Sequence, residues 1–528
     1  MTVAAKAMPA VPEEFWGHPK GLYVCFFTEM WERFSFYGMK ALLLLYLTKY
    51  HLFSDDHGYN LLGAYGGLVY AMPVIGGLLA DRYLGMRKSV VFGGVLLCLG
   101  HFGMALEGHQ ASVIDGVVHQ DIAALNVFYF SLSLIILGVG FLKPNISTIV
   151  GKLYRDNDPR RDSGFSIYYA GINLGALAAS LFAAWLGETF GWRFGFGAAG
   201  IGMLGGLLTF TLGQKHLLGY AEASNPEALR ERVLGPLSRE HLIYLASFVG
   251  LFGIWALIQQ HSLMFNLANW LPEMSAVLWS MHAISAVVLT GVFWFMFARC
   301  NSVERQQMTV LLGLIACCLV FFTLYEQTYG SWVLFSDRVM NRHFIIDWTA
   351  GQLTFLGALF IVVLAPIMSW LWPWLEHRGL NPSKPAKSAL GLIFAGLSFV
   401  VLAWSARNPQ DNGLTSLWWL VLAYFILEIG EMLLSPIGLS AVTQLSVPRV
   451  VGVMMGAWWL GTAYSEMFAA LLGKLSSIKV PEGSTLNVAD ALAKYDALFV
   501  YSAKIGIGCG LLVLLLTPLL KRMMHGVK

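Results

Sequence analysis

The sequence predicts an all-α membrane protein with two six-helix bundles and two inserted helices. The 528 residues are 57% hydrophobic and only 12% charged, and the mean hydropathy is +0.63. This composition excludes a water-soluble globular chain of this size. Fourteen apolar segments of helical length recur along the whole chain, at 21–48, 58–80, 88–107, 124–150, 164–187, 193–214, 241–260, 271–298, 307–328, 349–375, 386–405, 416–440, 450–473 and 497–520.

The chain divides where its composition changes. Residues 1–20 form a polar tail without a cleavable signal pattern, so the first apolar segment should stay in the mature protein. Residues 21–214 hold six segments, and a charged linker follows at 215–240. The pair at 241–300 has no charged residue at the centre of either helix and is expected to face lipid. Residues 301–528 hold six more, which predicts two pseudo-symmetric bundles around a central cavity.

Basic residues predict the orientation of the helices. If the N-terminus is cytoplasmic, the loops on its side contain most of the Lys and Arg residues, among them Arg82, Arg87, Lys88, Lys152, Arg155, Arg160, Arg161, Lys521 and Arg522. This bias places both termini inside. The six cysteines have no paired spacing that would indicate a metal site or a disulfide framework.

Charged side chains gather on one face of the first segment. Glu29, Glu32 and Arg33 lie within it, and Tyr37 and Lys40 follow at helical spacing. A central charge costs roughly 2.5–3.5 kcal/mol to insert, so such groups normally pair or face water. The face is expected to line a pathway for a proton or a charged solute. The alternative is a neutralised ion-pair cluster that only holds helices together.

Lys143 is a second unusual charge, late in the fourth segment within LGVGFLKPNIST. A lysine at this depth needs an acidic partner, and Glu29 and Glu32 are the expected ones. The alternative is a side chain that extends to the inner membrane surface.

The second half of the chain supplies acids of its own. Glu326 ends the run LIACCLVFFTLYEQ, and Glu428 and Glu431 lie in YFILEIGEMLLSPIGL. Glu431 precedes an expected helix break at Ser435-Pro436, where freed carbonyls can line a cavity, whereas Glu428 is as readily a structural carboxylate. Bases in the first half and acids in the second predict a site with opposite poles. A zwitterion fits such a site, and short peptides are the common flexible case.

A glycine-containing turn, GGLLADRYLGMRKS at 76–89, joins the second and third segments. Asp81 can cap a helix and pair with Arg82 or Arg87. We expect a cytoplasmic gate element here, and the alternative is a plain basic loop.

Several motifs resemble one family. EMWERFSFYG (29–38) resembles the ExxERFxxYG signature of proton-dependent oligopeptide transporters, a branch of the major facilitator superfamily. Further stretches resemble the second, fourth, fifth, sixth, seventh and tenth helices of that family, in the right order: LVYAMPVIGGLLADRYLG, GVGFLKPNIS, FSIYYAGINLGALAA, GWRFGFGAAGIGM, FFTLYEQTYGSWVLF and GEMLLSPIGLS. The two helices without central charges match the inserted pair of bacterial members.

The resemblance implies roles for individual residues. Proton coupling would rest on Glu29, Glu32, Arg33 and Glu326, and Glu326 would pair with Lys40. Arg33 and Lys143 would receive the peptide carboxylate, and Glu431 the amino group. The full substrate-binding set implied is Arg33, Tyr37, Lys40, Tyr70, Lys143, Asn173, Phe322, Glu431, Ser435 and Trp458. Gating would involve Asp81, Arg82 and Arg87.

Five positions depart from the family pattern. Phe36 replaces a common Tyr, and Phe322 stands where Trp is frequent. Lys40 stands where Arg is usual, which gives a point charge in place of a two-pronged guanidinium. Gly357 replaces a common Asn that helps hold the amino terminus. Gly63 replaces the coupling His of animal relatives, so coupling is expected to rest on carboxylates.

The expected function is proton-coupled import of di- and tripeptides by alternating access, in a bacterial inner membrane. The proton is the coupling ion, and no cofactor, nucleic acid or partner subunit is expected. One alternative is a proton-coupled carrier of another small anion or a drug-like solute. A membrane enzyme is the other alternative, but the sequence contains no HExxH, no GxSxG and no metal-ligand cluster.

Overall fold

The computed structural model describes residues 13–155, 158, 160–223, 225–259, 276–478 and 486–527. Each of the fourteen predicted segments coincides with a helix or a run of helices. Eleven of these in the described residues are long and apolar enough to cross a membrane. Most of the predicted tail, and residues 260–275 at the facing ends of the two intermediate segments, lie outside the described residues.

The helices of the first half are α1 (Lys20–Leu45), α2 (Asp55–Leu79), α3 (Met86–Met104), α4 (Ile122–Lys152), α5 (Arg161–Ala178), α6 (Trp185–Phe190) and α7 (Trp192–Gly213). Wider π-helical turns extend three of them, at η1 (Tyr46–Tyr50), η2 (Ala80–Leu84) and η3 (Ala179–Ala184), and η4 (Gln214–Leu217) is a short 3₁₀ turn. Between the halves lie α8 (Pro226–Arg230), α9 (Arg239–Gln259) and α10 (Ala276–Arg299).

The second half contains α11 (Ser302–Tyr325), α12 (Ser331–Val339), α13 (Phe355–His377), α14 (Lys384–Arg407), α15 (Leu417–Leu445), α16 (Val451–Gly473) and α17 (Val488–Met523). Short 3₁₀ turns are η5 (Glu326–Thr328), η6 (Gln352–Thr354), η7 (Pro448–Val450) and η8 (Lys474–Ser476). Short strand pairs occupy loops: β1 (Glu14–Phe15) with β2 (His18–Pro19), β3 (Ser112–Ile114) with β4 (Val117–His119), β5 (Arg232–Leu234) with β6 (Leu237–Ser238), β8 (His343–Phe344) with β9 (Ile346–Asp347), and β7 (Met340–Asn341) with β10 (Thr415–Ser416).

Polar caps fix where several helices begin. The side chain of Asp121 accepts from the backbone N–H of Ala124 at 3.1 Å at the start of α4. Asn301 and Glu304 form a reciprocal capping box at the start of α11. Each cap satisfies backbone donors that have no partner inside the helix, which matters most next to a bilayer.

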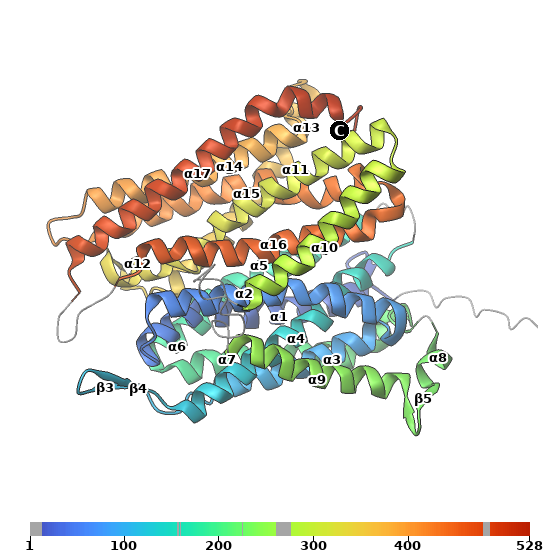
Figure 1. Cartoon of the computed structure of the whole chain (residues 1–528), viewed down its shortest axis with the longest axis horizontal. Coiled ribbons are helices and arrows are strands. Elements are labelled where there is room, and N and C mark those ends of the chain that lie inside the picture. Colours follow the sequence, from blue (N-terminus) through green and yellow to red (C-terminus); the bar gives the residue numbers. More distant parts are fainter. Residues whose placement is uncertain are drawn as a thin grey trace, which may run out of the picture.

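The helices form two layers (Figure 1). In the lower layer α1 packs on α5 and α7, and α4 on α2 and α3. In the upper layer α14 packs on α15 and α17, and α11 on α14, α15 and α16. The layers meet where α2 packs on α16 and α5 on α13. Of the two intermediate helices, α9 lies on α4, and α10 crosses obliquely between the layers and contacts α2, α11 and α16 (Figure 1).

Polar contacts join the layers at one end, here called the distal end. It is the end opposite the last helical turns of the chain, where α1 stops and α2 begins, at the left of Figure 1. Asp55 accepts from Nη1 and Nη2 of Arg338, both at 2.7 Å. Nζ of Lys49 lies 2.5 Å from Oδ1 of Asp337. Glu188 accepts from the backbone N–H of Gly351 at 2.7 Å. These contacts close the gap between the layers at the distal end.

Three boundaries differ from the expected ones. The seventh helix continues past residue 328, because after Gly330 the chain forms α12, which packs on α17. The last helix begins at Val488, earlier than expected, with Asn487 as its cap. The helix α15 also runs through the step from Ser435 to Pro436, where a break was expected. Tertiary packing and capping extend helices beyond their apolar cores.

We expect Asp55→Asn to weaken the distal closure. The change leaves the guanidinium of Arg338 (18% exposed) without its counter-charge. Breaking a buried pair in this way costs about 3–5 kcal/mol, measurable by reversible unfolding in mixed micelles. Lys49→Met is the control, because Lys49 is 44% exposed and its pair should contribute less than about 1 kcal/mol. Equal losses in both variants would contradict the assignment.

Candidate functional site

The first charged cluster lies on α1, where helical spacing brings both acids to one base. Nη2 of Arg33 donates to Oε1 of Glu32 at 2.6 Å, and Nε contacts the other oxygen of Glu32. Nε also lies 3.3 Å from Oε1 of Glu29. All three side chains are buried. The cation is thus shared by two carboxylates. The sequence predicted that these side chains share one face of the helix, but not this pairing.

The second cluster joins the two layers. Nζ of Lys40 on α1 lies 2.7 Å from Oε2 of Glu326 in η5 and 2.7 Å from Oε1 of Glu466 on α16. The expected contact between Lys40 and Glu326 is present, and Glu466 is an addition. Sequence reasoning missed Glu466, although a single acid in the middle of the apolar segment 450–473 is a signal of the kind that singled out Lys143.

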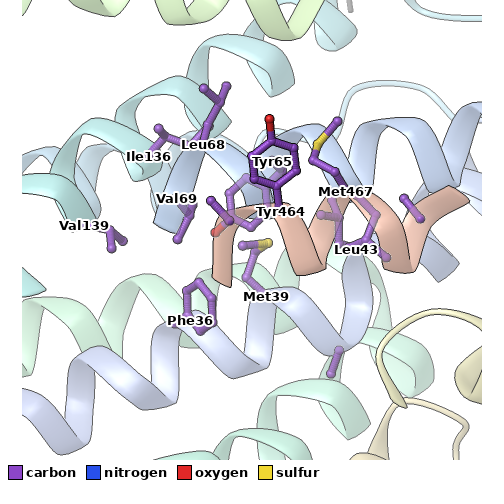
Figure 2. Close-up of a cluster of buried hydrophobic side chains, with 14 of the residues drawn as sticks. Phe36, Met39, Leu43, Tyr65, Leu68, Val69, Ile136, Val139, Tyr464 and Met467 are labelled. Atoms are coloured by element: carbon purple, nitrogen blue, oxygen red, sulfur yellow. The ribbon is translucent and has the colours of Figure 1, made fainter. Parts of the chain in front are cut away.

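Apolar packing surrounds the Lys40 cluster. Figure 2 shows Met39 and Leu43 of α1, Tyr65 of α2 and Met467 of α16 in one buried group. Gly66 of α2 provides the space for the side chain of Glu466. A Cβ at Gly66 would lie 2.5 Å from Oε2 and 2.6 Å from Cδ of Glu466. The cluster is therefore held in a largely buried interface between helices, where charge interactions are stronger than in water.

Lys143 on α4 has aromatic neighbours. Its Nζ lies 4.2 Å from the ring centre of Tyr70 and 5.5 Å from that of Trp459, a cation–π geometry. The expected partners Glu29 and Glu32 pair with Arg33 instead, because Arg33 is on their own helix face. Among the described residues Lys143 makes no ion pair. The residue as a whole is half-buried.

Two acids lie together on α15. Glu428 is fully buried and accepts from the hydroxyl of Tyr325 at 3.3 Å. Glu431 is half-buried and lies beside Glu428, Tyr325 and Ser435. Oε2 of each acid lacks a hydrogen-bond partner among the described residues. A Cβ at Gly357 would lie 2.9 Å from Oε1 of Glu428, so the glycine makes room for this second acid.

The remaining predicted binding residues lie around these groups. The ring of Tyr37 stacks on Tyr329 at 5.9 Å, and Phe322 lies edge-on to Tyr325 at 6.1 Å. Asn173 donates to the carbonyl of Tyr169 at 3.0 Å.

Among the tryptophans the structure distinguishes two neighbours. Trp459 stacks on Tyr70, with ring centres 6.5 Å apart, and also lies beside Lys143. The predicted Trp458 is buried against Gly438 of α15. One residue along a helix turns a side chain by about 100°, so choosing between adjacent tryptophans needs the structure. A pocket role for Trp458 stays a prediction.

The expected gate turn is anchored elsewhere than predicted. Arg87 pairs with Glu222 of the linker at 2.5 Å, in place of Asp81. The reason is the positive φ of Gly85 (77°), which turns the start of α3 toward the linker. A Cβ at Gly85 would lie 2.4 Å from the backbone nitrogen of Ala223. The side chain of Arg82 lies over the ring of Tyr83.

Comparison with known proteins places the chain. A family model described as the POT family matches residues 87–483. The chain belongs to the POT family. Among its relatives, "Uncharacterized transporter YclF" of Bacillus subtilis is 35% identical over 98% of each chain. "Peptide transporter YePEPT" of Yersinia enterocolitica is 32% identical over 97% of each. The "Di-/tripeptide transporter" of Lactococcus lactis is 34% identical over 87% of this chain and 90% of the relative.

Solved POT structures share the fold. The crystal structure of a peptide transporter POT in complex with sulfate superposes with a TM-score of 0.79, at 32% identity over 98% of each chain. A POT family transporter in complex with 5-aminolevulinic acid gives 0.78, at 26% identity over 97% of this chain and 99% of that one. The predicted fold class is confirmed, and this POT family protein is a multi-span membrane transporter and not an enzyme.

We expect Gly66→Ala to destabilise the POT fold through Glu466. The added methyl group would overlap the carboxylate, and forced repacking in a filled interface costs about 1–3 kcal/mol. The control is Gly197→Ala on α7, where a Cβ meets nothing within 4 Å, and which should be neutral or stabilising by up to about 1 kcal/mol. Unfolding of both variants is measured in the same micelles. A stable Gly66→Ala protein would show that Glu466 has room to move.

Proposed function

We propose that this POT family member is a proton-coupled symporter that imports di- and tripeptides by alternating access. The observation that carries the proposal is the polarity across the two layers. On α4 the ammonium of Lys143 has aromatic neighbours and no ion pair among the described residues. On α15 of the facing layer, Oε2 of Glu428 and Oε2 of Glu431 lack hydrogen-bond partners among the described residues. A peptide zwitterion satisfies both ends.

Peptide binding follows from these two poles. Lys143 and Arg33 receive the peptide carboxylate, and Glu431 receives the amino group with Asn173 and Ser435 nearby. Tyr37, Tyr70 and Phe322 contact the peptide side chains. A buried charge that gains an opposite charge and a hydrogen bond is stabilised strongly, which selects ligands that carry both termini.

Proton coupling uses carboxylates that hold bases. When Glu32 or Glu29 takes a proton, its attraction to Arg33 falls and the guanidinium becomes available to the substrate. When the carboxylates that contact Lys40 take protons, the contact between the layers weakens. The loaded protein can then close on one side and open on the other. The membrane potential adds about 2.3 kcal/mol per charge for each 100 mV.

The orientation rests on the basic loops. We place both termini in the cytoplasm of a bacterial inner membrane, which makes the distal end the outer one. The bundles 21–214 and 301–528 are the moving parts. The linker 215–240 and the gate turn with Asp81, Arg82 and Arg87 lie on the inner side, the pair 241–300 is peripheral, and one chain is sufficient for transport.

The direct test is uptake of labelled dialanine by proteoliposomes with an imposed inward proton gradient. Accumulation above the equilibrium level that collapses with a protonophore supports the proposal. Peptide equilibration without accumulation would overturn proton coupling, and transport of small anions in preference to dialanine would overturn the substrate class.

Lys143→Ala should weaken binding of peptides that have a free C-terminus far more than binding of their C-terminal amides. Losing one partner of a partly dehydrated ion pair costs about 2–5 kcal/mol. Competition against labelled dialanine measures both ligand types. Lys152→Ala, in the exposed last turn of the same helix, is the control and should change neither. Equal losses for both ligands would make Lys143 a structural residue.

Glu431→Gln should reduce the affinity for free-amine dipeptides by about 2 kcal/mol, which is roughly a 30-fold change in Kd. N-acetylated peptides should be little affected, since they lack the ammonium group that Glu431 is proposed to bind. The measurement is competition by both ligand types in parent and variant. Unchanged competition by free dialanine would move the role to Asn173 or to backbone carbonyls.

A further inference from the structure

The contact at Lys40 has one more acid than a simple ion pair needs. Glu326 and Glu466 each lie 2.7 Å from the same ammonium nitrogen, and they come from different elements, η5 and α16. Lys40 is 1% exposed, Glu466 3% and Glu326 10%. Gly66 of α2 leaves the space that the carboxylate of Glu466 fills. Glu466 is therefore a regular part of the contact at Lys40, with space provided for its side chain.

Charge balance sets what this cluster can do. With both acids ionised, one positive and two negative charges give a net charge of −1 in an apolar interface, which is costly. One proton shared by the two acids makes the cluster neutral and leaves one ionised carboxylate on Lys40. Two carboxyl groups this close titrate as a pair, so the proton belongs to both.

Two further cations lie near Lys40 but pair with neither Glu326 nor Glu466 among the described residues. The centre of the Phe36 ring lies 5.7 Å from Nζ of Lys40, 4.9 Å from Cζ of Arg33 and 6.0 Å from Nζ of Lys143, and Arg33 pairs with the acids of its own helix.

Tyr65 and Tyr70 of α2 lie within electrostatic range of the cluster, and the ring of Tyr329 lies 5.1 Å from Nζ of Lys40. These are phenols, which are neutral at physiological pH. Within the described residues the only cation in contact with the two acids is Lys40.

We propose that Glu466 is a second proton acceptor of this contact and is interchangeable with Glu326. A proton from outside adds to a carboxylate oxygen of either acid. The carboxyl group that results is neutral and loses its ion pair with Lys40. The layers separate at the distal end only when neither acid is ionised. On the inner-facing side a proton leaves, and the restored carboxylate binds Lys40 again. This inference rests on the proposed proton-coupled function.

The test compares Glu326→Gln, Glu466→Gln and the double variant in proteoliposomes. Each single variant keeps one carboxylate on Lys40, so we expect gradient-driven accumulation of dialanine within about threefold of the parent. The double variant should lose at least tenfold in accumulation but still exchange labelled for unlabelled dialanine between equilibrated compartments. Ser465→Ala, which removes a buried hydroxyl next to Glu466 that donates to the carbonyl of Thr462 at 2.6 Å, controls for disturbance of α16.

Three outcomes overturn the inference. In the first, Glu326→Gln alone abolishes accumulation while exchange persists, so that Glu326 acts without a substitute. In the second, Glu466→Gln alone abolishes it, so that the two acids are not interchangeable. In the third, the double variant accumulates like the parent. A parent that does not accumulate dialanine at all is a different result, because it overturns the proposed function.

A spectroscopic measurement keeps the test independent of transport. Infrared difference spectra between neutral and acidic pH report the carbonyl stretch of newly protonated carboxyl groups. Glu326 lies at the end of a helix. The Glu326→Gln protein should retain a carbonyl-stretch signal that disappears only when Glu466 is also replaced. If the spectra of Glu326→Gln and of the double variant are the same, Glu466 takes no proton and its role is structural.

Discussion

A charge inside a membrane protein normally has an opposite charge close by, and each of the two buried cations of the first helix has two. Arg33 lies between two acids of its own helix, and Lys40 between two acids of the facing layer. The two clusters differ in the number of elements that they join. The Arg33 cluster is internal to one helix and so survives any movement between layers, whereas the Lys40 cluster exists only while α1, η5 and α16 are together. One cluster can respond to substrate and the other to conformation.

Small residues decide how close the layers come. At the contact of α2 with α16, a Cβ on Gly63 would lie 2.5 Å from that of Ala470, and Gly66 leaves room for Glu466. Membrane helices have no hydrophobic effect to drive them together, so close packing and polar contacts carry the association. The same glycines that bring the helices close also admit the charged group, and packing and ionisation are therefore linked at one place.

Helices, their order and the fold class followed from the sequence because apolar length and charge-bearing loops are local properties. Glu29, Glu32, Arg33 and Lys40 were predictable for the same reason, since one helix face holds them. Contacts between residues on different helices were harder to predict from the sequence. Glu466 needed the knowledge that α16 faces Lys40, and Arg87 needed the turn at Gly85 that directs it to Glu222. The pairing of Glu428 with the space at Gly357 likewise joins positions on α13 and α15 that no spacing along the chain reveals.

The polar contacts of the two intermediate helices are made to different layers. Gln259 of α9 donates to Asn126 of α4 at 2.7 Å, and Lys88 of α3 binds Glu240 of α9 at 2.6 Å. On the other side, His282 of α10 lies 2.7 Å from the hydroxyl of Tyr464 of α16, and Arg305 of α11 donates to the carbonyl of Met296. Any tilt of one layer against the other therefore changes the angle between α9 and α10. The area that the protein occupies then differs between the two leaflets, and the lateral pressure of the bilayer enters the energy of each conformation.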